Sequence, residues 1–331
     1  MTNESSSNFK THVARSFADY LEIIKSIKSE NEKVWFRGQE SASYGLVPSA
    51  LREGYEIKDQ IGRDINPKMV NNDYNTRGNE VAYINVPGMV EDFKKLAREH
   101  LRIEPENNLE WYFLAQHYGI PTTLLDWTTD PLVSLFFAMP DTDKIIDDVT
   151  IEEAIMSFEK NSYSEHGAAV FVMDPGKTNE LISPFVLSRK DEEGKDILVN
   201  YPLDAIKHYH LLDGYLSRRS EHISPCCVTS TPIDKRICRQ SGNFTIHGAM
   251  IWPLDFYKVV QKEIHKIFIP YQCVREMKEM LTVLDITNDS IYGDSELDII
   301  SKNISQESRN KLETSIDHLI EKYKPVLTTD L

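Results

Sequence analysis

The sequence predicts an α+β fold in a single domain, and three observations point to it. Short segments rich in β-branched and aromatic residues alternate with segments in which apolar residues recur at helical spacing. The chain has no internal repeat and no clean linker that would divide it. Its 331 residues, of which 40% are hydrophobic and 27% charged, are typical of a soluble globular protein with a substantial core.

The N-terminal part is expected to begin with a flexible segment at residues 1–14, followed by a helix and a strand. Apolar residues at helical spacing over residues 17–27 predict an amphipathic helix. Residues 33–37 are β-branched and aromatic, which predicts a short strand that Gly38 ends. Arg37 would then lie at the carboxyl end of this strand, where binding sites are commonly built.

Two polar segments are expected to be surface insertions. Residues 53–80 are polar and aperiodic, and we expect them to be mobile. Residues 141–166 include seven acids and two lysines between Asp141 and Lys160, which is typical of an insertion or a solvated helix.

A strand followed by a helix is predicted in the most informative part of the chain. Residues 122–127 indicate a buried strand, and Asp130 and Pro131 are typical of the N-cap and the first residue of a helix. The strand end thus meets a helix N-terminus, whose free N–H groups and dipole favour an anionic ligand.

The remaining elements are predicted by the same two patterns. Helical spacing predicts helices at residues 89–97, 107–118, 271–284 and 312–323. Short apolar runs predict strands at residues 168–173, 223–228, 243–246 and 265–270.

The charge of the chain argues against one class of function. The 37 Lys and Arg residues against 52 Asp and Glu residues give a net charge of −15. Generic nucleic-acid binding draws on many cationic contacts to phosphates, so we do not expect it. A localised basic site remains compatible with this composition.

The cysteines and the N-terminus predict a cytoplasmic protein. Four cysteines occur, and the adjacent pair Cys226 and Cys227 is a poor start for a disulfide framework, so a reducing cytosol is expected. Neither a signal-peptide pattern nor an apolar run long enough for a membrane span is present, so no membrane association is expected.

The sequence gives no reason to expect a metal site. No Cys-x-x-Cys or His-Glu-x-x-His spacing occurs, and the suggestive histidines His117, His208 and His210 are expected at the surface or in caps. The chain also lacks a Gly-x-Ser-x-Gly motif and a Gly-rich phosphate loop after a strand. Nucleophile-elbow hydrolases and the common nucleotide folds are therefore disfavoured.

Polar residues at predicted strand ends form the candidate site. Arg37 offers a bidentate guanidinium to a phosphate or carboxylate, and Gly38 would let a ligand approach the backbone; alternatively, Arg37 pairs structurally with Asp126. Asp126 lies in an apolar run, where a buried carboxylate requires a cation or several N–H donors. Thr128 either caps the following helix or presents its hydroxyl to a ribose or phosphate.

A basic segment, residues 235–239, stands out in this acidic chain. It is either surface charge or a set of cations that holds a pyrophosphate, with the Gln240 side chain beside it as a neutral hydrogen-bonding group. Arg37 and this segment should mark the pocket of any phosphate-bearing ligand. Among the aromatic residues, which mostly predict core, Trp127 is the ring that we expect to stack on a flat heterocycle.

These residues together resemble the FRG domain, a family named for its Phe-Arg-Gly motif. The resemblance rests on residues 35–39 (WFRGQ), 46–52 (LVPSALR), 115–128 (AQHYGIPTTLLDWT), 131–132 (PL), 136–138 (FFA) and 239–245 (RQSGNFT). It extends over residues 15–305, which leaves residues 306–331 as a C-terminal helix and tail.

The layout of the FRG domain is similar to that of ADP-ribosyltransferases. This likeness implies an ADP-ribosyltransferase-like fold with a mixed or antiparallel split sheet and flanking helices, in which residues on three strands surround NAD. Carried over, Arg37 would hold the NAD phosphates or ribose, Thr128 would orient the nicotinamide ribose, and Gln240 would stand at the third position.

The likeness therefore implies two sets of site residues. The catalytic set is Arg37, Asp126, Thr128 and Gln240. The NAD-binding set is Arg37, Gly38, Gln39, His117, Trp127, Thr128 and Arg239. Many such transferases have a glutamate where Gln240 stands, and an amide supplies only a hydrogen bond. Either Asp126 supplies the negative charge, or the site binds a ligand without turnover.

Two functional hypotheses follow from this resemblance. The leading one is an NAD-dependent ADP-ribosyltransferase or NAD glycohydrolase of a bacterial defence or regulatory system, acting on a macromolecular acceptor. The alternative is a non-catalytic sensor or interaction module that binds a partner protein of a phage-defence complex. In that case the same polar residues are structural, and the acidic insertion makes the contacts.

Overall fold

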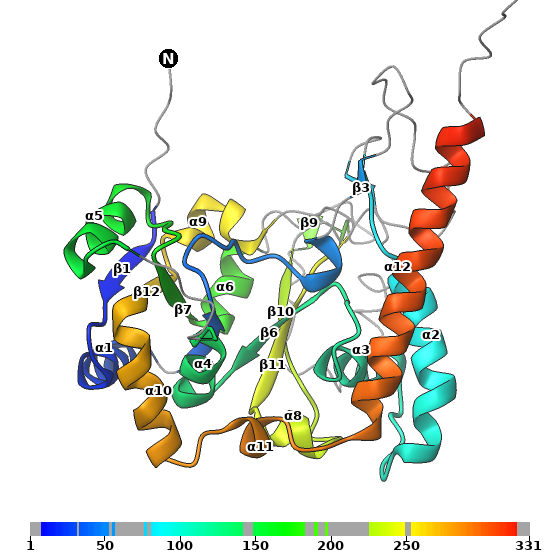
Figure 1. Cartoon of the computed structure of the whole chain (residues 1–331), viewed down its shortest axis with the longest axis horizontal. Helices are drawn as coiled ribbons and strands as arrows, with labels where there is room; N and C mark the ends of the chain where they lie inside the picture. The colour runs from blue at the N-terminus through cyan, green and yellow to red at the C-terminus, as the bar shows by residue number, and fades with distance from the viewer. Residues whose placement is uncertain are drawn as a thin grey trace, which may run out of the picture.

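The chain folds into a mixed sheet flanked by helices, so the predicted α+β fold class is confirmed (Figure 1). The structure is a computed structural model and describes residues 8–31, 33–52, 55–56, 76–77, 81–141, 148–182, 189–190, 196–197, 225–248 and 253–322.

The central sheet has seven strands in the order β1-β12-β7-β2-β6-β11-β10. β1 and β12 run parallel and the other neighbours antiparallel, so the sheet is mixed, as predicted. Its strands are β1 (Lys10–Val13), β2 (Trp35–Gln39), β6 (Leu124–Thr128), β7 (Gly167–Met173), β10 (Cys226–Thr229), β11 (Gly242–Ile246) and β12 (His265–Pro270). Two small sheets comprise β3 (Tyr55–Glu56), β4 (Thr76–Arg77) and β5 (Val81–Ala82), and β8 (Arg189–Lys190) and β9 (Asp196–Ile197).

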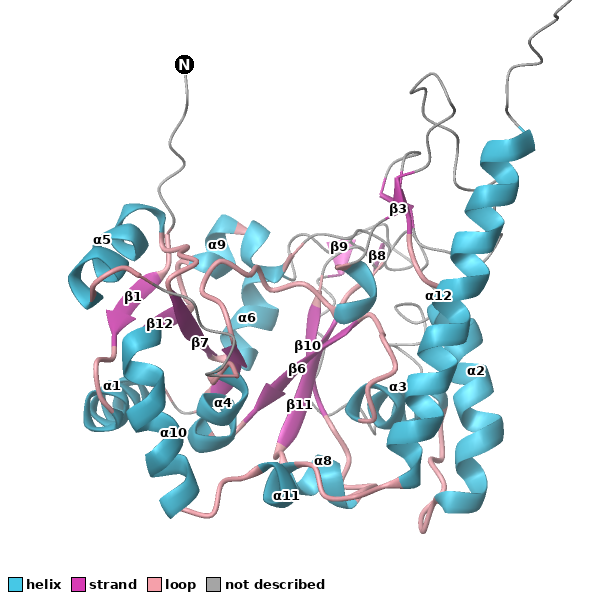
Figure 2. Ribbon diagram, in the orientation of Figure 1, coloured by secondary structure: helices cyan, strands magenta, loops and turns pink. Residues whose placement is uncertain are grey.

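Helices cover both faces of this sheet and its β10 end (Figures 1 and 2). They are α1 (Phe17–Glu30), α2 (Val86–Ala97), α3 (Asn108–His117), α4 (Pro131–Ala138), α5 (Ile151–Asn161), α6 (Pro175–Ile182), α8 (Lys235–Arg239), α9 (Lys258–Gln261), α10 (Val274–Val283), α11 (Asn288–Ile291) and α12 (Glu296–Lys322).

Side-chain alternation along the strands distributes the core over the two faces. On β7, Val170 and Val172 face the cluster formed with α1, α4 and α10, whereas Phe171 and Met173 face the cluster formed with α5, α6 and α9. This alternation is expected because successive strand side chains point to opposite faces of a sheet. A third cluster joins α2, α3 and α12 to β10 and β11.

The sheet is nearly divided between β2 and β6. Their one register pair is Phe36 opposite Thr128, whereas β2 pairs with β7 along its whole length, from Trp35 to Gln39. The strands β7 and β12 on one side and β6, β10 and β11 on the other therefore form two halves (Figure 2). The gap between the halves is where the candidate site lies.

The predicted end of the first strand was wrong, because Gly38 lies inside β2. Pairing with β7 continues through Gly38 to Gln39. A Cβ atom at position 38 would overlap the carbonyl oxygen of Ser134 in α4. The absence of a side chain at Gly38 therefore allows α4 to pack directly on β2.

The predicted flexible N-terminus also needs correction. Residues 10–13 form β1, which extends the sheet by pairing Lys10 with His265 and Val13 with Phe268. Residues 1–7 lie outside the described part of the chain. The predicted helix that follows is confirmed as α1, capped by the Ser16 side chain.

The two predicted insertions lie partly outside the described residues. Of residues 53–80, the structure describes 55–56 and 76–77; of residues 141–166, it describes 141 and 148–166. The latter range contains α5, whose Ala154, Ile155 and Phe158 are buried. α5 is thus a core-packing amphipathic helix, because its apolar residues at helical spacing contact the sheet.

The other predicted elements are confirmed with small shifts of their ends. The helix expected at 312–323 is longer than predicted, since α12 begins at Glu296, and the boundary expected between residues 305 and 306 falls inside it. Among the described residues, no helix combines the length and apolar character that a membrane crossing needs.

Candidate functional site

A cavity of about 440 Å³, here called the central cavity, opens where β2 and β6 part. Residues from distant parts of the chain line it. Its charged lining residues are Arg37, Glu40, Arg52, Asp126, Arg236 and Asp298, and its phenyl and phenol rings belong to Phe36, Tyr44, Tyr118, Phe137 and Tyr292. The cavity therefore combines three arginines and three acids with aromatic walls.

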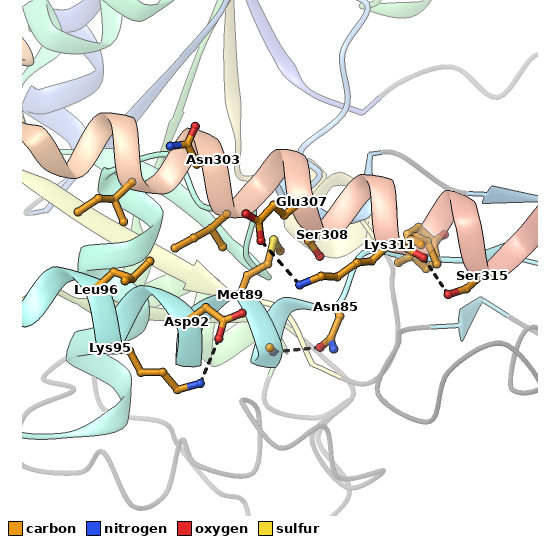
Figure 3. Close-up of a pocket in the computed structure, with 15 residues that line it drawn as sticks. Asn85, Met89, Asp92, Lys95, Leu96, Asn303, Glu307, Ser308, Lys311 and Ser315 are labelled. Atoms are coloured by element: carbon orange, nitrogen blue, oxygen red, sulfur yellow. Dashed lines mark hydrogen bonds and ion pairs between the residues drawn. The ribbon is translucent and has the colours of Figure 1, made fainter.

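A second cavity, of about 530 Å³, lies between α2 and α12 and has a different character (Figure 3). Its charged side chains pair with one another along each helix, as Lys95 does with Asp92 at 3.1 Å and Lys311 with Glu307 at 3.8 Å. Such exposed pairs contribute little and leave no charge that a ligand would satisfy. The central cavity is therefore the stronger candidate.

Arg37 occupies the gap between the two halves of the sheet. Its Nη1 donates a hydrogen bond of 2.8 Å to the carbonyl oxygen of Asp126, and it lies 3.8 Å from the Asp126 carboxylate. The Arg37 side chain is only 12% exposed, and its buried Nε has no hydrogen-bond partner among the described residues. Burial lowers the pKa of Arg37 to about 10, so the guanidinium stays charged at neutral pH.

The Asp126 carboxylate is less buried than the sequence predicted, because 39% of the side chain is exposed to the cavity side of β6. Its Oδ2 accepts a hydrogen bond of 2.7 Å from the Gln116 amide, which in turn accepts one of 2.6 Å from the Thr122 hydroxyl. The expected pairing of Asp126 with Arg37 is present. The carboxylate is thus held by a cation and an amide while part of it remains accessible.

Arg236, at the start of the short helix α8, forms another part of the cavity wall. Its guanidinium lies between the rings of Tyr118 and Tyr292, at 5.0 and 4.7 Å from their centroids, and forms an ion pair with Asp298 of α12. The side chain is 9% exposed, and no residue that the structure describes accepts a hydrogen bond from its Nε. Cation–π contacts and one carboxylate therefore hold a cation that has donor capacity left over.

His117 and Gln240 form a buried pair beside these residues. His117 Nδ1 lies 2.9 Å from Gln240 Oε1, and because an amide oxygen only accepts, the Nδ1 atom carries the proton. Burial lowers the pKa of His117, which keeps the ring neutral. The Gln240 amide nitrogen donates to the carbonyl oxygen of Ile291 at 3.5 Å. Both polar groups of Gln240 thus position neighbouring protein atoms.

A comparison with known protein families identifies the family of one part of the chain. Residues 32–145 match the family model of the FRG domain. The chain contains an FRG domain. This result confirms the resemblance seen in the sequence for residues 32–145. A comparison with curated proteins and with solved structures found no match, so the likeness to ADP-ribosyltransferases has no support from a structural neighbour.

The FRG-matched segment supplies one side of the central cavity, including Arg37, Arg52, His117 and Asp126. The other side comes from later residues, among them Arg236, Gln240, Tyr292 and Asp298. The segment 46–52 was recognised as part of the FRG resemblance, but Arg52 was not predicted as a site residue. The basic segment 235–239 indicated a site, but its pattern did not show that Arg236 is the member that lines the cavity.

Thr128, which was predicted either to cap a helix or to bind a ligand, has a structural role. Thr128 is 4% exposed, and its hydroxyl accepts a hydrogen bond of 3.0 Å from the Asp130 backbone N–H. Asp130 in turn accepts from the N–H groups of Leu132 and Val133 and so caps α4. The N-terminus of α4, which was expected to attract an anionic ligand, is therefore already occupied by the Asp130 carboxylate.

Trp127 and Arg239 also differ from expectation. Trp127 borders the cavity but is 2% exposed, and it packs in the core with its Nε1–H donating to Thr245 Oγ1 at 3.3 Å. Its ring therefore has no free face for a heterocycle. Arg239 is exposed, is not among the residues that line the central cavity, and lines a different cavity beside Gly293.

Gln39 remains at the cavity, with one part of its side chain already bound. Its amide nitrogen donates to the carbonyl oxygen of Gly45 at 3.2 Å, and its buried Oε1 has no partner. Among the described residues, no group of three or more His, Cys, Asp or Glu side chains has the arrangement of a metal site. His208 and His210 lie outside the described residues.

Proposed function

We propose that the central cavity binds NAD or a related nucleotide, and that the protein transfers ADP-ribose to a macromolecular acceptor or hydrolyses NAD. The observation that carries this proposal is the pair of buried arginines at the cavity. Arg37 and Arg236 are each about nine-tenths buried, and each keeps an Nε atom with no hydrogen-bond partner in the part of the chain that the structure describes. Because a buried donor without a partner is costly, a bound phosphate or ribose oxygen is a natural acceptor for it.

The mixed charge of the cavity fits NAD better than a simple anion. NAD combines a negatively charged pyrophosphate with a positively charged nicotinamide ring, and the cavity combines three arginines with three acids. Tyr44, Phe137 and Tyr292 offer rings against which a flat heterocycle can stack. A volume of about 440 Å³ lies in the range of ordinary small-molecule sites.

The proposed reaction breaks the bond between ribose C1′ and the nicotinamide nitrogen. The bonding electrons leave with nicotinamide, and positive charge develops on the ribose before water or an acceptor forms the new bond. In this proposal Arg37 holds the phosphates, and the half-exposed carboxylate of Asp126 stabilises the developing charge. Gln240 acts through His117, which it orients.

Isothermal titration calorimetry with NAD tests the binding step. Arg52 is the best position for substitution, because it is exposed and, among the described residues, is anchored by a hydrogen bond of 3.0 Å from its Nε to the Val47 carbonyl oxygen. We expect Arg52→Gln to weaken NAD binding by roughly ten-fold. Arg98→Gln, at a surface pair with Glu104 that does not line the cavity, is the matched control and should bind NAD as the wild type does. No NAD binding by the wild type would refute the proposal.

A second candidate function is ligand sensing without turnover. It is favoured by the internal hydrogen bonds of Thr128 and Gln240, which leave these two residues committed to the fold. Measurement of nicotinamide release from NAD separates the two functions. Release that depends on Asp126 supports catalysis, whereas NAD binding with no release and no labelled acceptor supports the sensor.

A further inference from the structure

A third cavity, of about 570 Å³, adjoins the central cavity and is here called the adjoining cavity. Three residues, Glu40, Phe137 and Tyr292, line both of them. The rest of its wall comes from the ends of α4 and α10 and from the segment that leads into α11. A group bound in the adjoining cavity would therefore lie next to a ligand in the central cavity.

Glu40 differs from the other two acids of the central cavity. Asp126 is held by Arg37 and Gln116, and Asp298 is held by Arg236. The exposed Glu40 carboxylate has no hydrogen bond or ion pair with any residue that the structure describes. Burial is the chief cause that raises the pKa of Tyr292, and the charge of Glu40 adds to this rise. This effect is consistent with the position of Glu40 beside the Tyr292 ring. Glu40 thus offers a full negative charge at the boundary between the cavities.

Aromatic rings line the adjoining cavity together with this carboxylate. The rings of Phe136, Phe137 and Tyr292 contact one another, with centroids 5.6 to 6.1 Å apart, and all three side chains are half-buried. Rings beside a carboxylate attract a cation through both the ring quadrupoles and the charge. Lys278 also lines the adjoining cavity. Unlike Glu40, however, Lys278 is not among the residues that line the central cavity.

We infer that the adjoining cavity binds the positively charged side chain of a protein acceptor, with Glu40 and the rings of Phe137 and Tyr292 as its contacts. The net charge of −15 supports this choice of partner, because an acidic protein attracts a basic one. The binding of a cation is independent of NAD. Its role as acceptor rests on the proposed function.

In the proposed transfer step, one bond to ribose C1′ of NAD forms and another breaks. A nitrogen of the bound guanidinium or ammonium group loses a proton to the Glu40 carboxylate and forms a bond to ribose C1′ of NAD. The bond from C1′ to the nicotinamide nitrogen breaks, and its electron pair leaves with neutral nicotinamide. The proton then passes from Glu40 to water, so NAD and the acceptor yield the ADP-ribosylated acceptor, nicotinamide and a proton.

Titration with small probes tests the cation site in the absence of NAD. The probes are Nα-acetyl-arginine methylamide, its lysine counterpart, and Nα-acetyl-citrulline methylamide, which is the neutral counterpart of the arginine probe. We expect the arginine probe to bind roughly ten-fold more tightly than the citrulline probe. Comparison of the arginine and lysine probes distinguishes a guanidinium from an ammonium preference.

Substitution of Glu40 locates the site. Glu40→Gln should abolish the difference between the arginine and citrulline probes, and Tyr292→Leu should reduce it. Glu159→Gln, at an exposed position of α5, is the matched control and should retain it. Equal binding of the charged and neutral probes by the wild type, or an unchanged preference in folded Glu40→Gln, would overturn the inference.

Titration of the same proteins with NAD separates this inference from the proposed function. If NAD binds but no cationic probe does, the inference fails and the proposed NAD site stands. If the arginine probe binds through Glu40 but NAD does not bind, the proposed function and the transfer step fail together. With both ligands present, we expect a mass spectrum to show the ADP-ribosylated probe for the wild type and a loss of at least about ten-fold for Glu40→Gln.

Discussion

The guanidinium of Arg37 bridges the gap between β2 and β6 by donating a hydrogen bond of 2.8 Å to the backbone carbonyl of Asp126. The two strands pair at one register position only. The Arg37 side chain therefore adds a hydrogen bond between strands that backbone hydrogen bonds link elsewhere in the sheet. The same side chain borders the central cavity. Arg37 therefore both links the two halves of the sheet and forms part of the cavity wall.

Replacement of Arg37 should destabilise the protein. Arg37→Gln removes a charged hydrogen-bond donor and leaves the Asp126 carbonyl without its partner, so we expect unfolding free energy to fall by about 1.5–3 kcal/mol. Urea denaturation followed by circular dichroism measures this change. Arg98→Gln is the control, because its surface pair with Glu104 should contribute less than about 1 kcal/mol. Equal losses in both variants would contradict the bridging role.

The packing of α4 on β2 predicts a difference between two glycines. In Gly38→Ala the new methyl group would overlap the Ser134 carbonyl oxygen, so we expect a loss of about 1–3 kcal/mol or more. In Gly45→Ala the nearest atom, a carboxylate oxygen of Asp255, is 3.5 Å from the new carbon, which is ordinary contact. Thermal unfolding should therefore show a markedly lower Tm for Gly38→Ala than for Gly45→Ala. Similar Tm values would mean that α4 shifts easily.

The fully buried Lys266 predicts a dependence of stability on pH. Its Nζ donates a hydrogen bond to the Ala42 carbonyl oxygen at 2.8 Å and lies 3.9 Å from the centre of the Tyr163 ring. The carboxylate of Asp255 attracts the charged form of Lys266. Burial lowers the pKa of Lys266 from 10.5 to about 7. Between these two values the unfolded chain binds the extra proton, so stability should rise with pH, by at most ~1.4 kcal/mol per pH unit.

Urea unfolding between pH 7 and 9 measures this slope. Lys266→Met removes the titrating group and should remove its contribution to the slope, whatever its effect on the absolute stability. Lys262→Met, at an exposed position, should leave the slope unchanged. A slope that persists in Lys266→Met would show that another group titrates in this range.

The hydrogen bond between His117 and Gln240 predicts a fixed form of the imidazole ring. Because burial lowers the pKa of His117, we expect a neutral ring at pH 6.5, with the proton on Nδ1. Nitrogen NMR of labelled histidines distinguishes this tautomer from the other. In Gln240→Leu the Nδ1–H loses its acceptor, which should cost about 1–3 kcal/mol of unfolding free energy. Protonation of His117 with a half-point above pH 6.5 would contradict the prediction.

The elements of secondary structure were largely predictable because their causes are local. Apolar spacing indicated α1, α3 and α10, and the pair Asp130 and Pro131 indicated the start of α4. The FRG resemblance likewise rested on contiguous residues and is confirmed for residues 32–145. The continuation of β2 through Gly38 was not predictable, since it depends on pairing with β7, far along the chain.

The candidate site could be predicted only in part from residue patterns. Local sequence indicated Arg37, Asp126 and Gln240, and these three do lie at one cavity. Patterns gave no means to choose Arg236 over Arg239, because the orientation of the short helix α8 decides which of them lines the central cavity. They also did not indicate Glu40 and Tyr292, because the return of the chain after α10 brings Tyr292 to the cavity that Glu40 lines.

Local sequence thus accounts for the helices, the strands and the FRG motif, because capping, propensity and side-chain alternation act over a few residues. The central cavity, its buried arginines and the Glu40 carboxylate, which has no partner among the described residues, arise from tertiary structure. They exist because strand pairing brings β2, β6 and β11 together and the C-terminal segment then packs Tyr292 and Asp298 against Arg236. The chemistry of the site is therefore a property of long-range contacts.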